Sequence, residues 1–154
     1  MLHDLVHYIH VLAGVVWGGG IILVAWVVFP LIGQQSFGSA KEMFARVESL
    51  AGPVLATSGV LVYAAGIARG WMGGVTSFPD LMEPYGRTVL GAFFIVTVFM
   101  GIEGAMRSRL RKSLADEATF AASFQKAMRL NRLLITGGVV IIIAIMAALR
   151  LGLY

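Results

Sequence analysis

Residues 1–30 read MLHDLVHYIHVLAGVVWGGGIILVAWVVFP, and the interpretation of the whole chain begins with this stretch. It holds all three histidines of the protein, at His3, His7 and His10. At about 100° per residue, their spacings of four and three place the imidazoles within a sector of roughly 60° on one helix face. Gly14 and Trp17 continue this face into an apolar run that ends at Pro30. The stretch therefore predicts an apolar helix with one histidine-bearing face.

The composition indicates the solvent that surrounds this helix. Of the 154 residues, 58% are hydrophobic and 13% are charged, and the mean hydropathy is +0.86. A soluble domain is about one-quarter charged, so we expect an integral membrane protein in contact with the lipid bilayer and without a nucleic-acid partner. The first apolar run is too long for a signal-peptide core, and we expect it to be retained. The absence of cysteine excludes disulfides and Cys-bound iron–sulfur clusters.

Four segments are long and apolar enough to cross a hydrocarbon core of about 30 Å. They cover about residues 5–31, 51–68, 88–106 and 133–149. We therefore predict a single transmembrane domain over residues 1–154, folded as an all-α, antiparallel four-helix bundle in the membrane.

The first connection carries a local start signal for the second helix. Ser39 and Glu42 have the spacing of a capping box, which predicts a helix that starts near Ala40. We expect this helix to bend or restart at Pro53, because proline removes a hydrogen bond from the helix ladder.

The other two connections differ from each other. Residues 70–86 are rich in Gly and Pro and show no helical periodicity, so we expect a loop. Residues 107–132 are charged but keep apolar residues at helical spacing, which predicts two helices that extend past the membrane, with a turn near Asp116 as the N-cap. The apolar positions are Leu110, Leu114, Phe120, Phe124 and Met128.

Basic residues are distributed unevenly between the two sides of the predicted bundle. Nine fall on the side of the first and third connections: Lys41, Arg46, Arg107, Arg109, Arg111, Lys112, Lys126, Arg129 and Arg132. The other side has three, Arg69, Arg87 and Arg150. The positive-inside rule then predicts a multi-pass protein of the bacterial cytoplasmic (inner) membrane, with both termini and the histidines outside.

His10 is the strongest candidate for a ligand. It lies near the outer edge of the hydrocarbon core, where a buried ionisable group without a partner costs several kcal/mol. Imidazole is a good ligand of haem iron, and Gly14, one turn below, would let a flat macrocycle lie against the backbone. His7 is the second candidate. We expect Trp17 to pack inside the bundle, and Glu103, on the inner side, to pair with Arg107 or to belong to a quinone or proton site.

The first span resembles that of the CopD-like superfamily, which includes the copper-resistance membrane protein CopD and the HemJ-type protoporphyrinogen oxidases. The matching residues are His10, Trp17, Gly19 and Pro30. The resemblance implies a b-type haem held by the first-span histidine. It covers the first span; the remainder matches in the number and size of spans.

The chain also departs from this pattern. HemJ-type proteins are expected to use a lysine in the third span, and residues 88–106 contain none. His7 and His10 share one helix face, so they cannot bind opposite faces of one haem. The sixth position of the iron would be empty, occupied by Met72 or Met82, or supplied by another chain. Arg69, Arg87 and Arg150 would pair with haem propionates or anchor the span ends among lipid phosphates.

Three functions remain open at this point, and no catalytic residue is assigned. The first is a haem-b protein of electron transfer, with iron at His10, acting alone or within a larger membrane redox complex. The second is copper handling by the imidazole and thioether ligands His3, His7, His10, Met72 and Met82. The third is an accessory subunit whose histidines do no chemistry. A homo-oligomer and a quinone are further candidate partners.

Overall fold

The fold was analysed in a computed structural model, which describes residues 1–153. Within these residues the chain is almost entirely helical and has no β-strand. The elements in order are α1 (Leu2–Leu23), η1 (Val24–Val28), α2 (Phe29–Gly33), α3 (Phe37–Met72), η2 (Pro79–Met82), α4 (Pro84–Ser113) and α5 (Glu117–Leu151). The predicted all-α, four-helix architecture is confirmed, with α1, η1 and α2 forming one continuous helical rod.

Four helical segments are long and apolar enough to cross a membrane: Leu2–Gly33, Phe37–Met72, Pro84–Ser113 and Glu117–Leu151. Each contains one of the predicted spans. A crossing needs about 20 residues, and these segments have 30 to 36, so each continues beyond the hydrocarbon core. The protein is therefore a multi-pass α-helical membrane protein.

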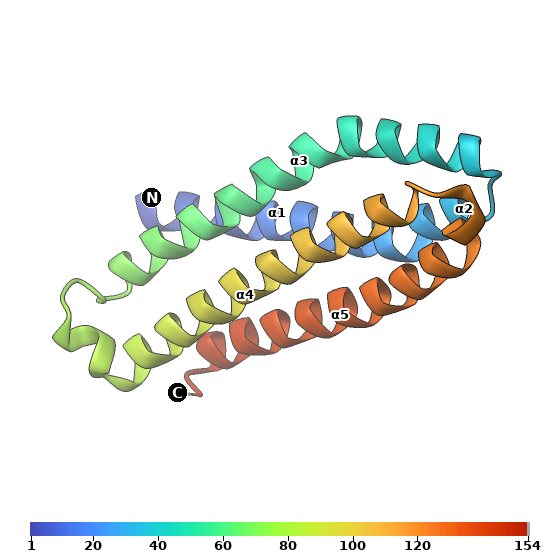
Figure 1. The fold of residues 1–154 in the computed structure, drawn as a ribbon. Helices are drawn as coiled ribbons and strands as arrows, with labels where there is room; N and C mark the ends of the chain where they lie inside the picture. Colours follow the sequence, from blue (N-terminus) through green and yellow to red (C-terminus); the bar gives the residue numbers. More distant parts are fainter. Residues whose placement is uncertain (154) are drawn as a thin grey trace.

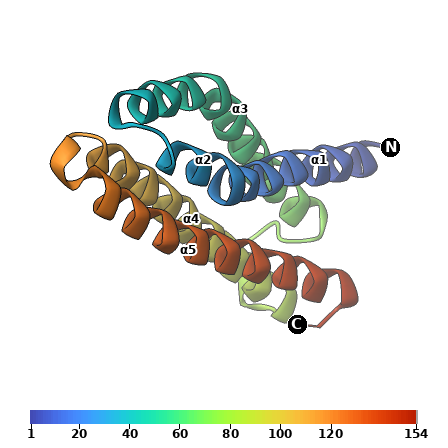
Figure 2. The ribbon, with the colours of Figure 1, turned by 90° about the vertical axis from the view of Figure 1, so that its right-hand side faces the viewer.

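The helices run antiparallel and give the bundle two distinct ends (Figure 1). The start of α1, the end of α3, the start of α4 and the end of α5 lie at one end, which we call the histidine end. The α2–α3 and α4–α5 turns lie at the other, which we call the basic end because nine of the twelve Lys and Arg residues belong to it. Figure 2, viewed from the basic end, shows α1 and α2 between α3 and the α4–α5 pair.

A π-helical segment interrupts the first rod just before Pro30. Phe29 donates its N–H to the Val24 carbonyl instead of the Ala25 carbonyl that a regular α-helix would use. The released Ala25 carbonyl accepts a hydrogen bond from Nε of Arg132 at 3.2 Å, which joins this segment to α5. The sequence-based reading did not anticipate the π segment.

The start of α3 corrects one prediction. The helix begins at Phe37 with Ser36 as N-cap residue, not near Ala40 with Ser39 as the cap. The Ser36 backbone is extended, with φ −60° and ψ 155°, which is the conformation an N-cap residue adopts. Its hydroxyl donates to Ser39 Oγ at 3.0 Å, so Ser39 lies within the first turn.

Pro53 bends α3 without ending it. The helix is continuous from Phe37 to Met72, and Figure 1 shows that its first part runs in a different direction from its second. Of the two outcomes expected at Pro53, a bend or a restart, the structure shows the bend.

Of the two remaining connections, the α3–α4 loop is shorter than predicted and the α4–α5 turn is as predicted. The loop expected over residues 70–86 is reduced, because α3 continues to Met72, a 3₁₀ turn covers Pro79–Met82 and α4 begins at Pro84. The α4–α5 turn agrees with expectation: Asp116 is the N-cap of α5, and its carboxylate accepts from the Ala118 N–H at 3.1 Å.

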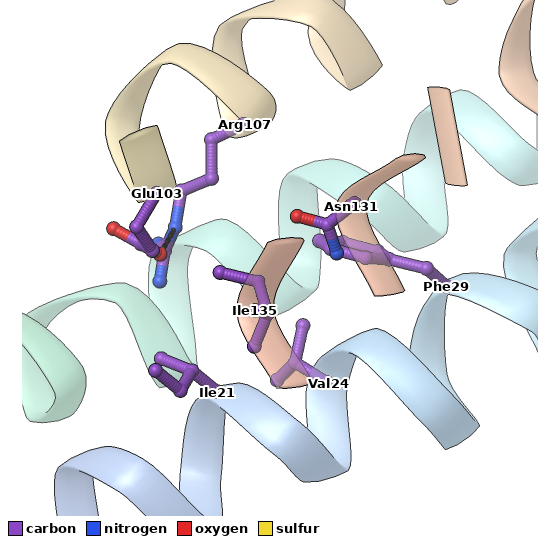
Figure 3. Close-up of a pocket in the computed structure, with 7 residues that line it drawn as sticks. All are labelled: Ile21, Val24, Phe29, Glu103, Arg107, Asn131 and Ile135. Carbon is purple, nitrogen blue, oxygen red and sulfur yellow. Dashed lines mark hydrogen bonds and ion pairs between the residues drawn. The ribbon is translucent and has the colours of Figure 1, made fainter. Parts of the chain in front are cut away.

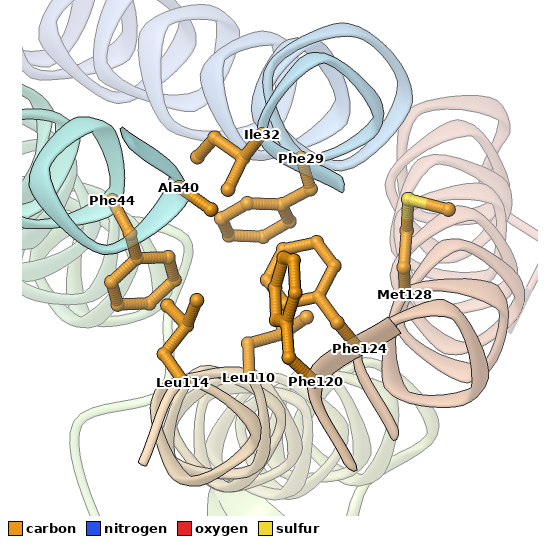
Figure 4. Close-up of a cluster of buried hydrophobic side chains, with 9 residues drawn as sticks. All are labelled: Phe29, Ile32, Ala40, Phe44, Leu110, Leu114, Phe120, Phe124 and Met128. Atoms are coloured by element: carbon orange, nitrogen blue, oxygen red, sulfur yellow. The ribbon is translucent and has the colours of Figure 1, made fainter. Parts of the chain in front are cut away.

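The buried core is concentrated toward the basic end. One cluster joins α2, α3, α4 and α5 there and includes all five apolar positions predicted from residues 107–132 (Figure 4). A second cluster, in the middle of the bundle, consists of Trp17, Ile21, Ala25, Leu55, Phe99 and Ile135. The prediction that Trp17 packs inside the bundle is confirmed, and its ring meets Phe99 edge-on at 5.7 Å between centroids.

Candidate functional site

His10 faces α3 and makes a hydrogen bond across the α1–α3 interface. Its Nδ1 lies 3.0 Å from the backbone carbonyl oxygen of Val62. A carbonyl only accepts, so Nδ1 is the donor in this hydrogen bond, and in the neutral ring Nε2 would then keep its lone pair. Metal-ligating histidines commonly have this arrangement, because a hydrogen bond from one ring nitrogen fixes the tautomer and orientation of the other.

Two polar atoms near His10 are buried without a partner. They are Nδ1 of His7 and Nε of Arg69, and neither has a hydrogen-bond partner within the described residues. Both residues lie close enough to His10 to interact with it electrostatically. An unsatisfied buried donor costs about 1–3 kcal/mol, so the Arg69 guanidinium is poised for an anionic or carbonyl acceptor.

The helix α3 supplies the opposite wall of this site through residues that recur on one face. Val62, Gly66 and Arg69 follow each other at helical spacing. A Cβ added to Gly66 would lie 3.4 Å from Cε1 of His10, so glycine allows the imidazole to approach the α3 backbone closely. Together with His7 and His10, these residues form what we call the histidine site.

The remaining predicted residues of the first helix have different surroundings. A Cβ on Gly14 would lie 4.0 Å from Cγ2 of Val62, so Gly14 faces α3. Trp17 belongs to the core cluster in the middle of the bundle, farther from the histidine end than His10 and Gly14. His3 is exposed, and its Nδ1 is 4.0 Å from Asp4.

The other residues named from the sequence lie at the histidine end but are more exposed. Arg87 is near the start of α4 and Arg150 near the end of α5, and both side chains are exposed. Met72, the last residue of α3, and Met82, in η2, are exposed as well. Of the three arginines, only Arg69 has a buried, unpartnered atom. Within residues 1–153 no group of three or more His, Asp and Glu side chains is gathered as a metal site.

A second polar cluster lies near the basic end. Arg107 Nε donates to Glu103 at 2.5 Å, as predicted, and its Nη1 donates to Glu48 of α3 at 3.3 Å. Glu48 also accepts from Arg111 Nη2 at 2.5 Å. The side chains of Glu48, Glu103 and Arg107 are each only 20–22% exposed. This ion network joins α3 to α4 on the far side of the bundle from the histidine site.

A small cavity separates this network from α5 (Figure 3). Its volume is about 10 Å³, close to the least space that holds one water molecule. Asn131 projects toward it from α5, is only 3% exposed, and makes no side-chain hydrogen bond within the described residues. Glu103 and Arg107 reach the same cavity from α4.

Sequence reasoning identified His10 but not its partner on α3. The available signal was the spacing of glycines, since Gly52, Gly59 and Gly66 recur every seven residues on one face of α3. Gly59 lies against the Trp17 ring and Gly66 against the His10 ring. Such small-residue faces allow helices in membranes to approach closely.

An apolar, antiparallel four-helix rod with a histidine site at one end and an ion network near the other defines the class: a multi-pass α-helical membrane protein. Comparison with known proteins adds no family to this class, because no protein-family model, curated protein or solved structure matches the chain.

Proposed function

We propose that the protein binds a b-type haem through Nε2 of His10 and transfers electrons, alone or as a subunit of a larger membrane redox complex. The observation that carries this proposal is the hydrogen bond from His10 Nδ1 to the Val62 carbonyl, which leaves Nε2 as the ring nitrogen that could bind a metal. The bound haem would supply one-electron redox chemistry.

The surroundings of His10 suit such a group in two further respects. Arg69 has an unsatisfied, buried Nε beside the imidazole, and a guanidinium binds the carboxylate of a propionate with charge-assisted hydrogen bonds. Gly66 leaves the α3 backbone free of a side chain next to the ring. These residues would hold the imidazole and the acidic edge of the ligand in fixed positions.

Visible spectra of the detergent-purified protein, oxidised and reduced, test the proposal. Wild-type protein should show the bands of a six- or five-coordinate b-type haem, and His10→Ala should abolish them. His3→Ala is the matched control and should leave the spectrum unchanged, because His3 is exposed. Full haem content in His10→Ala with an unaltered spectrum would reject His10 as the ligand and make His7 the leading candidate.

Metal analysis of the same preparation separates iron from copper. Iron should exceed copper at about one iron per chain. Stoichiometric copper without iron would replace the haem proposal by the copper-handling alternative, in which the imidazoles and the thioethers of Met72 and Met82 bind the metal.

We further propose that the basic end faces the cytoplasm of a bacterial cell and the histidine end faces outward. The excess of Lys and Arg on the two turns of the basic end supports this orientation. The chain has no native cysteine, so single cysteines at the exposed Ala115 and Ser77 can be labelled individually. Labelling of Ala115→Cys from the outside of intact cells would reverse the orientation.

A further inference from the structure

A groove opens on the basic end between the first part of α3 and the last turns of α4. Its volume is about 520 Å³, within the range of about 300–1,000 Å³ that is usual for small-molecule sites. The ion network closes it on one side, since Glu48 and Arg111 are among the lining residues. The bend of α3 at Pro53 changes the direction of the wall that carries Glu48 (Figure 1).

The walls of the groove combine an apolar floor with a cationic rim. Phe44 and Leu114, each 4% exposed, form the floor beneath the groove, Ala45 is its exposed apolar residue, and Lys41 and Arg111 supply positive charge. Glu48 contributes the one carboxylate, but it is already bound by both Arg107 and Arg111. The groove therefore has no free anionic group and retains a net positive charge.

Both cationic residues of the groove have hydrogen-bond donors that are not used by other residues. Lys41 makes no ion pair within residues 1–153, and its ammonium has three donors. Arg111 uses Nη2 for Glu48, while its side chain is 67% exposed. An anion with several acceptor oxygens could bind to both residues without displacing Glu48.

The groove lies next to the predicted boundary of the hydrocarbon core. The second predicted span begins at about residue 51 and the third ends at about residue 106, whereas the groove is lined by residues 41–49 and 111–114. Arg111 is about 7.5 Å beyond Met106 along an α-helix. This distance corresponds to the headgroup layer of a bilayer.

We propose that this groove binds the headgroup of an anionic phospholipid. The phosphate lies between Lys41 and Arg111, and the glycerol and the first acyl carbons lie along Ala45 and the aliphatic parts of the Lys41 and Arg111 side chains. Basic pockets on the cytoplasmic side of transmembrane helices bind such headgroups. The proposal is independent of the haem at the opposite end.

Native mass spectrometry of the intact protein in detergent measures the binding directly. The protein is titrated with phosphatidylglycerol and, in parallel, with phosphatidylcholine of the same acyl chains. Lys41→Gln removes one rim charge that has no ion-pair partner, so the variant should fold normally. The double variant Lys41→Gln/Arg111→Gln removes both. The matched control is Arg46→Gln/Lys112→Gln, which removes the same charge from the same two helices outside the groove.

The wild type should bind phosphatidylglycerol about tenfold more tightly than phosphatidylcholine, and this preference should fall about threefold in Lys41→Gln and vanish in the double variant. The control pair should keep it. Three results would overturn the proposal: an equal affinity for both lipids, an equal loss in the control pair, or complete displacement of the lipid by millimolar inorganic phosphate. The last would identify a site for free phosphate.

Discussion

At the basic end, side chains from α2, α3, α4 and α5 pack around four phenylalanines, and a partly buried ion network links α3 to α4. At the histidine end, the described residues form no comparable apolar cluster, and the α1–α3 contact includes a hydrogen bond from an imidazole to a backbone carbonyl. The two ends of the bundle therefore differ in how they are held together. The basic end is stabilised by packing and ion pairs, whereas the histidine end leaves two buried polar atoms, His7 Nδ1 and Arg69 Nε, without a hydrogen-bond partner among the described residues.

The largest effect on stability should come from removing an aromatic side chain from the core at the basic end. Phe124 is fully buried, and Phe124→Ala should lower the free energy of unfolding by about 3–5 kcal/mol, because it leaves a cavity. Phe93→Ala at the histidine end should cost about 1 kcal/mol, since the Phe93 ring is only partly buried, against Tyr63 and near Gly66, and lipid can replace lost contacts.

Unfolding of both variants in mixed micelles measures this contrast. Phe94→Ala is the control for the loss of an aromatic ring from a lipid-facing position, because Phe94 is 70% exposed. Equal losses in Phe124→Ala and Phe93→Ala would show that the two ends are packed alike, and the comparison would fail.

The next effect concerns the ion network. Glu48→Gln should lower the free energy of unfolding by about 1–3 kcal/mol, because Arg107, only 21% exposed, loses one of its two carboxylate partners. Glu42→Gln is the matched control on the same helix. Glu42 pairs with Arg46 while both are largely exposed, and such a surface pair is worth about 0.2–1 kcal/mol or less. A smaller loss in Glu48→Gln than in Glu42→Gln would contradict the account of the basic end.

Local sequence patterns predicted much of this basic end. The apolar spacing over residues 107–132, the Asp116 cap and the Glu103–Arg107 pair each depend on residues within about one turn of each other, and all three are confirmed. The prediction of Ser39 as the N-cap of α3 was wrong, because the residue with the extended N-cap backbone is Ser36, and the capping-box spacing of Ser39 and Glu42 does not reveal it.

The histidine site was only partly predictable for a different reason. His10 could be selected from its position on an apolar helix, whereas its partner, the Val62 carbonyl, is 52 residues away and carries no side-chain signature. The burial of Arg69 Nε also depends on how α1 and α3 pack. The haem at His10 stays a prediction, as does the quinone or proton role of Glu103.

A smaller effect should come from Asn131. The residue is only 3% exposed, lines the cavity and makes no side-chain hydrogen bond to the described residues. Replacing a buried polar group that lacks a protein partner by an apolar group of similar shape is close to neutral or stabilising. Asn131→Leu should therefore change the free energy of unfolding by less than about 1 kcal/mol, or raise it. A loss above about 2 kcal/mol would mean that Asn131 makes an essential hydrogen bond in the folded protein.

The smallest effect should appear in the loop that joins α3 to α4 at the histidine end. Hydrogen bonds from the Ser77 hydroxyl and from the backbone amides of Thr76 and Ser77 lower the pKa of Asp80 below its usual value. Oδ2 of Asp80 accepts from the Thr76 and Ser77 amides at 2.9 and 2.7 Å. The ionised Asp80 carboxylate therefore stabilises the loop, and because its folded pKa is lowered, this stabilisation is complete above the unfolded pKa of about 3.9. The stabilisation is lost as the pH falls through the lower pKa of the folded protein.

Amide chemical shifts of Thr76 and Ser77 should therefore titrate with a midpoint below about 3.9, and Asp80→Asn should abolish the transition. A midpoint above that value would show that the carboxylate is not held by these donors.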